Sequence, residues 1–279
     1  MNISTLNKPA AFLIRDLQIA LSYKLQFLLQ FVGIFFSSMV FFFVSKLIGG
    51  GISDQLAPWG GDYFSFVIIG VALTDYLSVS LEGFSNEIRS AQVEGTLETL
   101  LVTPTPVSTI LFSSTLYNYS VTSLRVIVYI VLGALLFGLN LHMTSILSFI
   151  VVMILTVASF AGIGLISAAF IIVFKQGSPI NLAVTTGSGL LGGVFYPIDI
   201  LPSWLEPVSW FLPITHALEA MRQILINGAS FSMIYNKVLI LALFSALLLN
   251  LAFPYPGISF LAWIALVPLF LVIMTGNLK

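Results

Sequence analysis

Residues 87–104 read EIRSAQVEGTLETLLVTP, a polar segment that lies between two long hydrophobic runs. The chain has only 10 Lys and Arg and 11 Asp and Glu in 279 residues, yet four of these charges fall within twelve positions here, at Glu87, Arg89, Glu94 and Glu98. Charged side chains are costly inside a bilayer. We therefore interpret the segment as lying outside the bilayer.

The second half of this segment has the pattern of a short helix. Gly95 and Thr96 can end the preceding helix and cap a new one, and Pro104 stops the new helix. Three leucines share one face at helical spacing, Leu97, Leu100 and Leu101. A short helix with an apolar face suits a groove in a partner protein, and an ordinary loop between two spans is the alternative.

The composition places the chain in a membrane. Hydrophobic residues make up 58% of it and charged residues 8%, with a mean hydropathy of +1.08, whereas soluble domains carry about 25% charge. A net charge of -1 without a basic tract argues against nucleic-acid binding. The absence of cysteine excludes disulfides and thiol nucleophiles, and His142 and His216 lack metal-site spacing, so we expect no metal site.

Six hydrophobic segments predict transmembrane helices, because a span needs about 20 mostly apolar residues. In a bilayer the backbone must satisfy its own hydrogen bonds, which favours helices. The predicted fold is therefore an all-α polytopic membrane bundle in residues 1–253, with spans near 25–45, 63–81, 116–139, 146–174, 180–195 and 238–253. Residues 254–279 form an atypical hydrophobic tail.

The segment before the first span, residues 9–23, mixes apolar residues with charged ones and predicts an amphipathic helix in the membrane interface; a frayed tail is the alternative. Lys and Arg favour the cytosolic side of a membrane. If the spans alternate, one side holds Lys8, Arg15, Lys24, Arg89 and Lys175, while Arg222 and Lys237 fall on the other side and weaken the bias. We therefore expect a cytosolic N-terminus.

Residues 196–227, after the fifth predicted span, do not have the pattern of a plain loop. The run is apolar but interrupted by prolines, which break helices, and a helical pattern begins near residue 213. Two short helices that dip in from the outer face fit this pattern. The residues that define this re-entrant outer segment are Tyr196, Pro197, Leu201, Pro202, Pro213, Glu219 and Arg222.

Several polar and small residues near this segment allow more than one interpretation. Glu219 and Arg222 are spaced so that they could pair on one helix, as a structural contact. We expect His216, one turn upstream, to be a hydrated residue at the interface. Gly189 and Gly193 match the small-residue motif of packed membrane helices, which suits either a contact within the chain or a dimer interface.

Asp75 and Arg125 lie within predicted spans, where charge is costly. They could line a polar path or pair across helices. We favour the simpler interpretation, in which Asp75 faces the bundle and Arg125 extends toward the cytosolic interface. The sequence has no Gly-Lys pair and therefore no phosphate loop, so we expect any ATP that powers the protein to be bound by another chain.

The sequence resembles the ABC-2 type transporter permeases, the membrane halves of ATP-binding-cassette exporters. Residues 94–104 are similar to the cytosolic coupling-helix segment of that family. LPSWL at residues 201–205, followed by PITHALEAMR at residues 213–222, is similar to the family's re-entrant outer segment. Together with the amphipathic N-terminus, the resemblance covers roughly residues 8–250.

The resemblance implies a permease subunit of an exporter in the inner membrane, without an ATPase site and with no cofactor of its own. Two copies, expected to be a homodimer, would form the path through the membrane lipid. Separate ATPase subunits, which would hold ATP and Mg²⁺, would dock at Glu94, Gly95, Thr96, Leu97, Glu98, Leu100, Leu101, Thr103 and Pro104. Substrates of the family include glycans, drugs and other amphiphiles.

The C-terminal tail departs from this family. Residues 251–269, LAFPYPGISFLAWIALVPL, resemble the opening hairpin of apolipoprotein N-acyltransferases. A membrane enzyme is therefore a competing class, but the sequence lacks the cluster of polar catalytic residues that this class predicts. An ATP-independent secondary transporter or channel subunit is the other alternative; such transporters often have broken spans in matching halves, and the halves here do not match.

Overall fold

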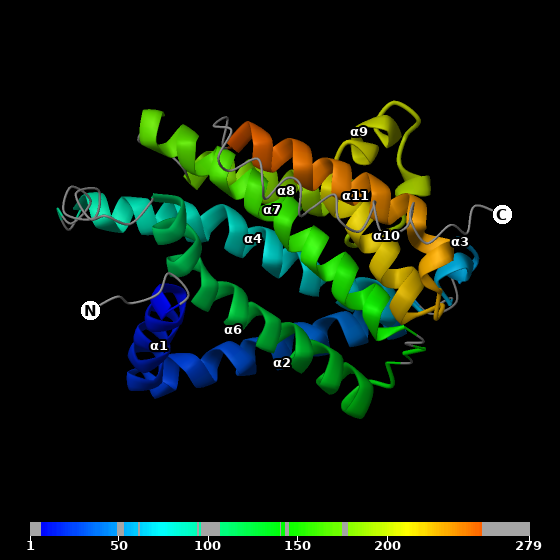
Figure 1. Ribbon diagram of the computed structural model, residues 1–279. Coiled ribbons are helices and arrows are strands. Elements are labelled where there is room, and N and C mark those ends of the chain that lie inside the picture. Colours follow the sequence, from blue (N-terminus) through cyan, green and yellow to red (C-terminus); the bar gives the residue numbers. More distant parts are fainter. Residues whose placement is uncertain are drawn as a thin grey trace.

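The structure is a computed structural model that describes residues 7–48, 53–60, 62–93, 95, 107–139, 141–142, 145–174 and 178–252. Within these ranges the chain forms helices and turns but no strand, which confirms the predicted all-α bundle. Figure 1 shows the long helices running beside one another, with the short helices α3 (Ser53–Leu56) and α9 (Glu206–Trp210) toward one end of the bundle and the N-terminal helix toward the other.

Within the described residues, five helices are long and apolar enough to span a membrane. They confirm five of the six predicted spans as helices, although α11 begins well before the predicted residue 238. The helices are α2 (Lys24–Ile48), α4 (Tyr63–Val93), α6 (Val107–Leu136), α7 (Ile146–Phe174) and α11 (Phe231–Ala252). The predicted N-terminal helix is also present, as α1 (Asn7–Ser22), and it packs against α6 and α2.

The fifth predicted span, residues 180–195, differs from the prediction. It corresponds to α8 (Ser178–Leu191), which has 14 residues and is therefore about 21 Å long, shorter than a hydrocarbon core of about 30 Å. The helix ends because the chain turns at Gly193, whose φ of 79° lies in the left-handed region that glycine adopts without strain. Helix α8 is thus too short to cross such a core by itself.

Helix α4 is the centre of the bundle. Of its membrane-spanning residues 72% are buried, against 11% for α2, and it contacts α2, α6, α7, α8 and α10. It continues to Val93, past the predicted end at residue 81, so Glu87 and Arg89 belong to this helix and not to a separate segment. Gly95 follows with a φ of 68°, in agreement with the predicted helix break.

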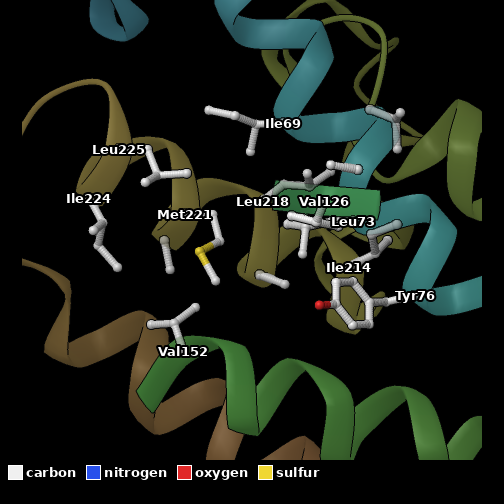
Figure 2. Close-up of a cluster of buried hydrophobic side chains, with 14 of the residues drawn as sticks. Ile69, Leu73, Tyr76, Val126, Val152, Ile214, Leu218, Met221, Ile224 and Leu225 are labelled. Atoms are coloured by element: carbon white, nitrogen blue, oxygen red, sulfur yellow. The ribbon is translucent and has the colours of Figure 1, made fainter. Parts of the chain in front are cut away.

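Small residues let the helices of the bundle approach one another closely. A Cβ atom at Gly164 of α7 would lie 2.0 Å from the carbonyl oxygen of Ser80 in α4, so the two backbones are nearly in contact there. The hydroxyls of Ser159 in α7 and Ser245 in α11 are 2.7 Å apart. Figure 2 shows the apolar core to which α4, α6, α7 and α10 (Pro213–Leu225) contribute buried side chains.

Candidate functional site

Three short helices connect α8 to α11, in the region predicted to be a re-entrant outer segment and called the outer segment below. They are η3 (Ile198–Ile200), α9 (Glu206–Trp210) and α10. Pro197 stands immediately before η3, and Pro213 is the first residue of α10, where the missing N–H removes no helical hydrogen bond. The structure therefore has three short helices separated by prolines where the sequence predicted two, and their depth in a membrane stays a prediction.

The turns between these helices are closed by local hydrogen bonds. The hydroxyl of Tyr196 donates to the carbonyl of Leu190 and so ties the segment back to α8. The N–H of Leu201 donates to the Ile198 carbonyl at 3.0 Å, and the carbonyl of Pro202 accepts a bond of 2.8 Å from Leu205. Tyr196, Leu201 and Pro202 therefore each take part in a hydrogen bond that closes one of these turns.

Arg222 of α10 is the buried charge that organises this segment, with 3% of its surface exposed. Its Nε and Nη2 atoms donate to the carbonyl oxygen of Phe66 in α4, at 3.1 and 3.0 Å. Nη1 donates to the carbonyl of Gly193 at 2.8 Å, and Nη2 also donates to that of Val194 at 3.1 Å. The guanidinium carbon lies 3.3 Å from the centroid of the Phe66 ring, in cation–π contact.

Arg222 stabilises the turn that follows α8, where buried backbone carbonyls need hydrogen-bond donors. Arg222 provides hydrogen-bond donors just beyond the end of α8, at Gly193 and Val194. Only glycine fits at position 70 of α4, because a Cβ there would lie 2.5 Å from the Val194 oxygen and 3.1 Å from Nη2 of Arg222.

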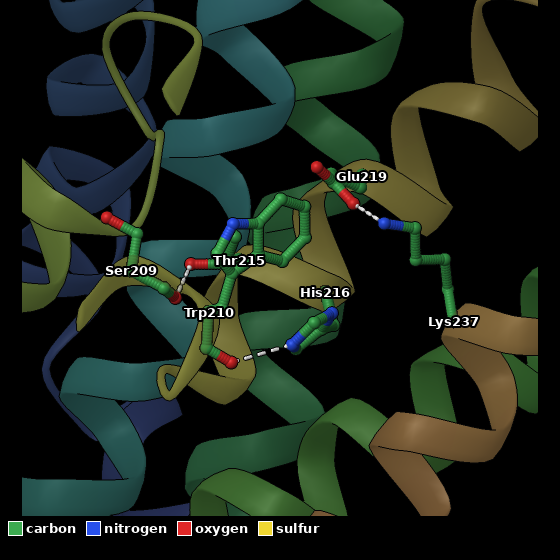
Figure 3. Close-up of polar contacts among 6 residues, drawn as sticks. All are labelled: Ser209, Trp210, Thr215, His216, Glu219 and Lys237. Atoms are coloured by element: carbon green, nitrogen blue, oxygen red, sulfur yellow. Dashed lines mark hydrogen bonds and ion pairs between the residues drawn. The ribbon is translucent and has the colours of Figure 1, made fainter. Parts of the chain in front are cut away.

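Glu219 does not form the predicted pair with Arg222. Its carboxylate instead accepts a hydrogen bond from the ammonium of Lys237 in α11 (Figure 3). That ammonium also lies 4.7 Å from the centroid of the Trp210 ring. The prediction was wrong because the guanidinium of Arg222 is already held by three backbone carbonyls, while the turn between α10 and α11 brings Lys237 beside Glu219.

His216 is buried, with 3% of its surface exposed, so the prediction of a hydrated side chain was wrong. Its ring contacts those of Trp210 and Phe244, with centroids 5.5 and 5.8 Å away. Nε2 is 2.8 Å from the Trp210 carbonyl oxygen (Figure 3). A carbonyl only accepts, so Nε2 carries the proton, and buried Nδ1 has no hydrogen-bond partner among the described residues.

Burial lowers the pKa of His216 below its usual value, and Lys237 acts in the same direction, while the hydrogen bond to the Trp210 carbonyl and the charge of Glu219 oppose this shift without reversing it. The folded protein therefore binds this proton less readily than the unfolded chain, whose histidines titrate near pH 6.5. Stability is complete above about pH 6.5 and decreases as the pH falls toward the lower folded pKa. We expect the melting temperature to fall between pH 7 and pH 5 less steeply in His216→Gln than in the wild type, when both are measured in detergent.

His142→Gln is the matched control for this measurement, because His142 is the other histidine of the chain and is exposed. The slope of His216→Gln is compared with the slope of this variant as well as with that of the wild type. A His216→Gln protein with an unchanged slope would show that this ring does not contribute to acid sensitivity.

Asp75 lies on α4 and Arg125 on α6, two helices that pack together and whose Tyr76 and Ser123 hydroxyls are 2.9 Å apart. Both side chains are half-buried. Arg125 attracts the Asp75 carboxylate electrostatically, but the two form no ion pair within 4.0 Å, and Nε of Arg125 is buried without a hydrogen bond to any residue that the structure describes. The structure therefore does not support a direct pair.

The remaining predicted residues are the two glycines of the packing motif and the coupling residues between positions 94 and 104. Gly189 lies within α8 but Gly193 lies beyond its end in a left-handed turn, so the two do not form one helical face. Of the predicted coupling residues only Gly95 is described, and it is exposed. The other coupling residues lie outside the described residues: Glu94, Thr96, Leu97, Glu98, Leu100, Leu101, Thr103 and Pro104.

The structure adds residues that the sequence analysis missed. Phe66 supplies a backbone carbonyl and a ring face to Arg222, Gly70 leaves the space for Val194, and Lys237 pairs with Glu219. A backbone carbonyl has no signature in a sequence, and only the glycine within a span could have indicated a close approach. In the described part of the chain no three His, Cys, Asp or Glu side chains come together as metal ligands.

The chain is similar to known transport proteins. It is 25% identical over 186 residues to the inner membrane transport permease YadH of Escherichia coli, a match that covers 66% of this chain and 70% of YadH. The probable multidrug ABC transporter permease YbhR of E. coli is 24% identical over 170 residues, 61% of this chain and 44% of YbhR. The linearmycin resistance permease protein LnrN of Bacillus subtilis is 30% identical over 112 residues, 40% of this chain and 29% of LnrN.

The ABC-2 type transporter family matches residues 11–226, which include both the polar segment after α4 and the outer segment as far as α10. The apolar helices and the permease relatives indicate a membrane transport protein, as this family match does. The chain therefore belongs to the ABC-2 type transporter family and is a multi-pass membrane permease subunit of an ABC transporter.

Proposed function

We propose that two copies of this permease form the export path for an amphiphile, a glycan or a drug in the inner membrane, driven by ATPase subunits that dock at residues 94–104. The family match across residues 11–226 carries this proposal, because it includes the proposed docking segment. ATP and Mg²⁺ would then be bound by the ATPase, and this chain would convert the movement of the ATPase into movement of helices.

The helix ends on either side of the docking segment support the proposal. Helix α4 ends at Val93, Gly95 turns the chain, and α6 begins at Val107. A push on residues 94–104 would therefore act directly on two membrane-spanning helices. The Lys and Arg distribution favours the same side of the membrane for this segment and for the N-terminus, which we place in the cytosol.

The names of two relatives support an amphiphilic or drug-like substrate. YbhR is named as a probable multidrug permease and LnrN as a linearmycin resistance protein. This chain spans less than half of either relative, so their substrates suggest a chemical class and not a compound. Accumulation of an amphiphile inside cells that lack the permease, reversed by restoring the gene, would support export; depletion inside those cells would contradict it.

Leu100→Asp tests the docking site. The substitution puts a charge on the apolar face that the sequence predicts for this short helix, so we expect it to abolish co-purification of the ATPase that accompanies the wild-type permease. The measurement is a pull-down of the tagged permease from detergent-solubilised membranes, with the ATPase identified by its phosphate-loop sequence.

Ser203→Asp is the control, because it adds the same charge at an exposed position of the outer segment. It should leave the complex intact. An undiminished complex with Leu100→Asp would exclude this face as the docking site, while loss of the complex in both variants would indicate a general effect of added charge.

A further inference from the structure

Helix α4 connects the two ends of the permease. Its 31 residues make it about 46 Å long. One end leads into residues 94–104, and the other end carries Phe66 and Gly70, which contact the outer segment. Because α4 is the most buried of the five spans, a displacement at one end must move its packed neighbours or break their contacts.

Arg222 is the polar link between this outer end of α4 and the outer segment. Two of its nitrogen atoms bind the Phe66 carbonyl, and its guanidinium plane covers the Phe66 ring. The same group binds the carbonyls of Gly193 and Val194, beyond the end of α8. A planar fork with fixed donors holds these groups in one geometry, which the single ammonium of a lysine cannot reproduce.

We propose that Arg222 is a positioning residue for transport, which makes α4, the chain just beyond α8 and α10 move as one unit when the ATPase acts. This inference rests on the proposed docking of the ATPase at residues 94–104. Helix α10 is bound in turn to α11 through Glu219 and Lys237. Movement of α4 is thereby transmitted across the outer end of the bundle.

The physical basis is the cost of separating these groups where they are buried. Arg222 is buried, as are the Phe66, Gly193 and Val194 residues whose carbonyls it binds. A buried polar group that loses its partner without gaining water costs more than the bond contributed. The guanidinium of Arg222 therefore keeps its contacts with these carbonyls when α4 moves, unless Arg222 itself is replaced.

The test uses the complex of full-length permease and its co-purifying ATPase in proteoliposomes. The sequence contains no cysteine, so Ser203→Cys, at an exposed position of the outer segment, provides a single site for a membrane-impermeant maleimide. With Arg222 present, we expect the labelling rate to change when the ATPase is trapped with ADP and vanadate. With Arg222→Lys, we expect this change to be lost while the complex and its ATP hydrolysis persist.

Selective loss of the labelling change distinguishes transmission from a purely structural role, because a destabilised permease would lose the complex and the hydrolysis too. If Arg222→Lys does not assemble, Gly70→Ala decides the question. Its methyl group would meet the Val194 oxygen at 2.5 Å and Nη2 of Arg222 at 3.1 Å, so it would push α4 away from the chain beyond α8 although the arginine is retained. Gly187→Ala is the control, because a Cβ there meets nothing within 4 Å.

The outcomes separate this inference from the proposed function. A labelling change that persists in Arg222→Lys, or in Gly70→Ala if the lysine variant fails to assemble, overturns the inference and leaves ATPase docking untouched. A wild-type complex that hydrolyses ATP without any labelling change also overturns the inference alone. Failure of the wild-type permease to bind an ATPase overturns both proposals.

Discussion

Arg222→Met is expected to destabilise the permease by roughly 2–6 kcal/mol, because the carbonyls of Gly193 and Val194 each lose a buried donor at about 1–3 kcal/mol. Methionine keeps an apolar stem of similar length but donates no hydrogen bond. Removing a buried charge offsets part of this loss. We expect the loss at the two carbonyls to be the larger effect, since Arg222 contacts them at 2.8 and 3.1 Å and both Arg222 and Val194 are buried.

The measurement is thermal unfolding of purified protein in detergent, together with the yield of folded protein. Gln223→Ala is the matched control on the same helix, at the next residue, whose side chain is half-buried. It should stay close to the wild type. An Arg222→Met protein as stable as the wild type would show that the four hydrogen bonds of Arg222 do not stabilise the fold.

Lys237→Met is expected to lower the free energy of unfolding by about 1–3 kcal/mol, because Glu219 keeps its charge and loses its partner. The side chains of Lys237 and Glu219 are 23% and 14% exposed, so solvent screens this pair less than a surface pair. Lysine also covers the Trp210 ring, and that contact would be lost as well. Thermal unfolding in detergent again provides the measurement.

A double-mutant cycle isolates the ion pair from these other contacts. In Lys237→Met combined with Glu219→Gln no unpaired charge remains, so we expect the double variant to be more stable than the sum of the two single losses implies. Additive losses would mean that the two side chains act independently. The position of α10 on α11 would then rest on apolar packing alone.

Much of the fold could be predicted from patterns along the chain. A span is a local property, because about 20 apolar residues in succession must form a helix in lipid. Five spans, the N-terminal helix and the proline-interrupted outer segment were predicted for this reason and are present. The prediction failed at α8, because its apolar composition suggested a full span. The helix has only 14 residues, and the chain turns at Gly193 soon after its end.

The candidate site could be predicted only in part. Arg222 and Glu219 were identified as residues of the outer segment, but their partners were not. Spacing along one helix suggested that they pair with each other, whereas the structure pairs Glu219 with Lys237 of the next helix. His216 was expected in water because histidine is polar, and it contacts the rings of Trp210 and Phe244 instead.

The sequence by itself determined that this chain is a helical membrane protein, where most of its helices lie, and which segment resembles the docking site for an ATPase. These properties depend on runs and spacings of neighbouring residues. Only the tertiary structure decided what Arg222 binds, since its partners are backbone carbonyls up to 156 positions away in the chain. Every residue but proline offers the same carbonyl and N–H, so the choice among them is made by helix packing, here by the close approach that Gly70 allows.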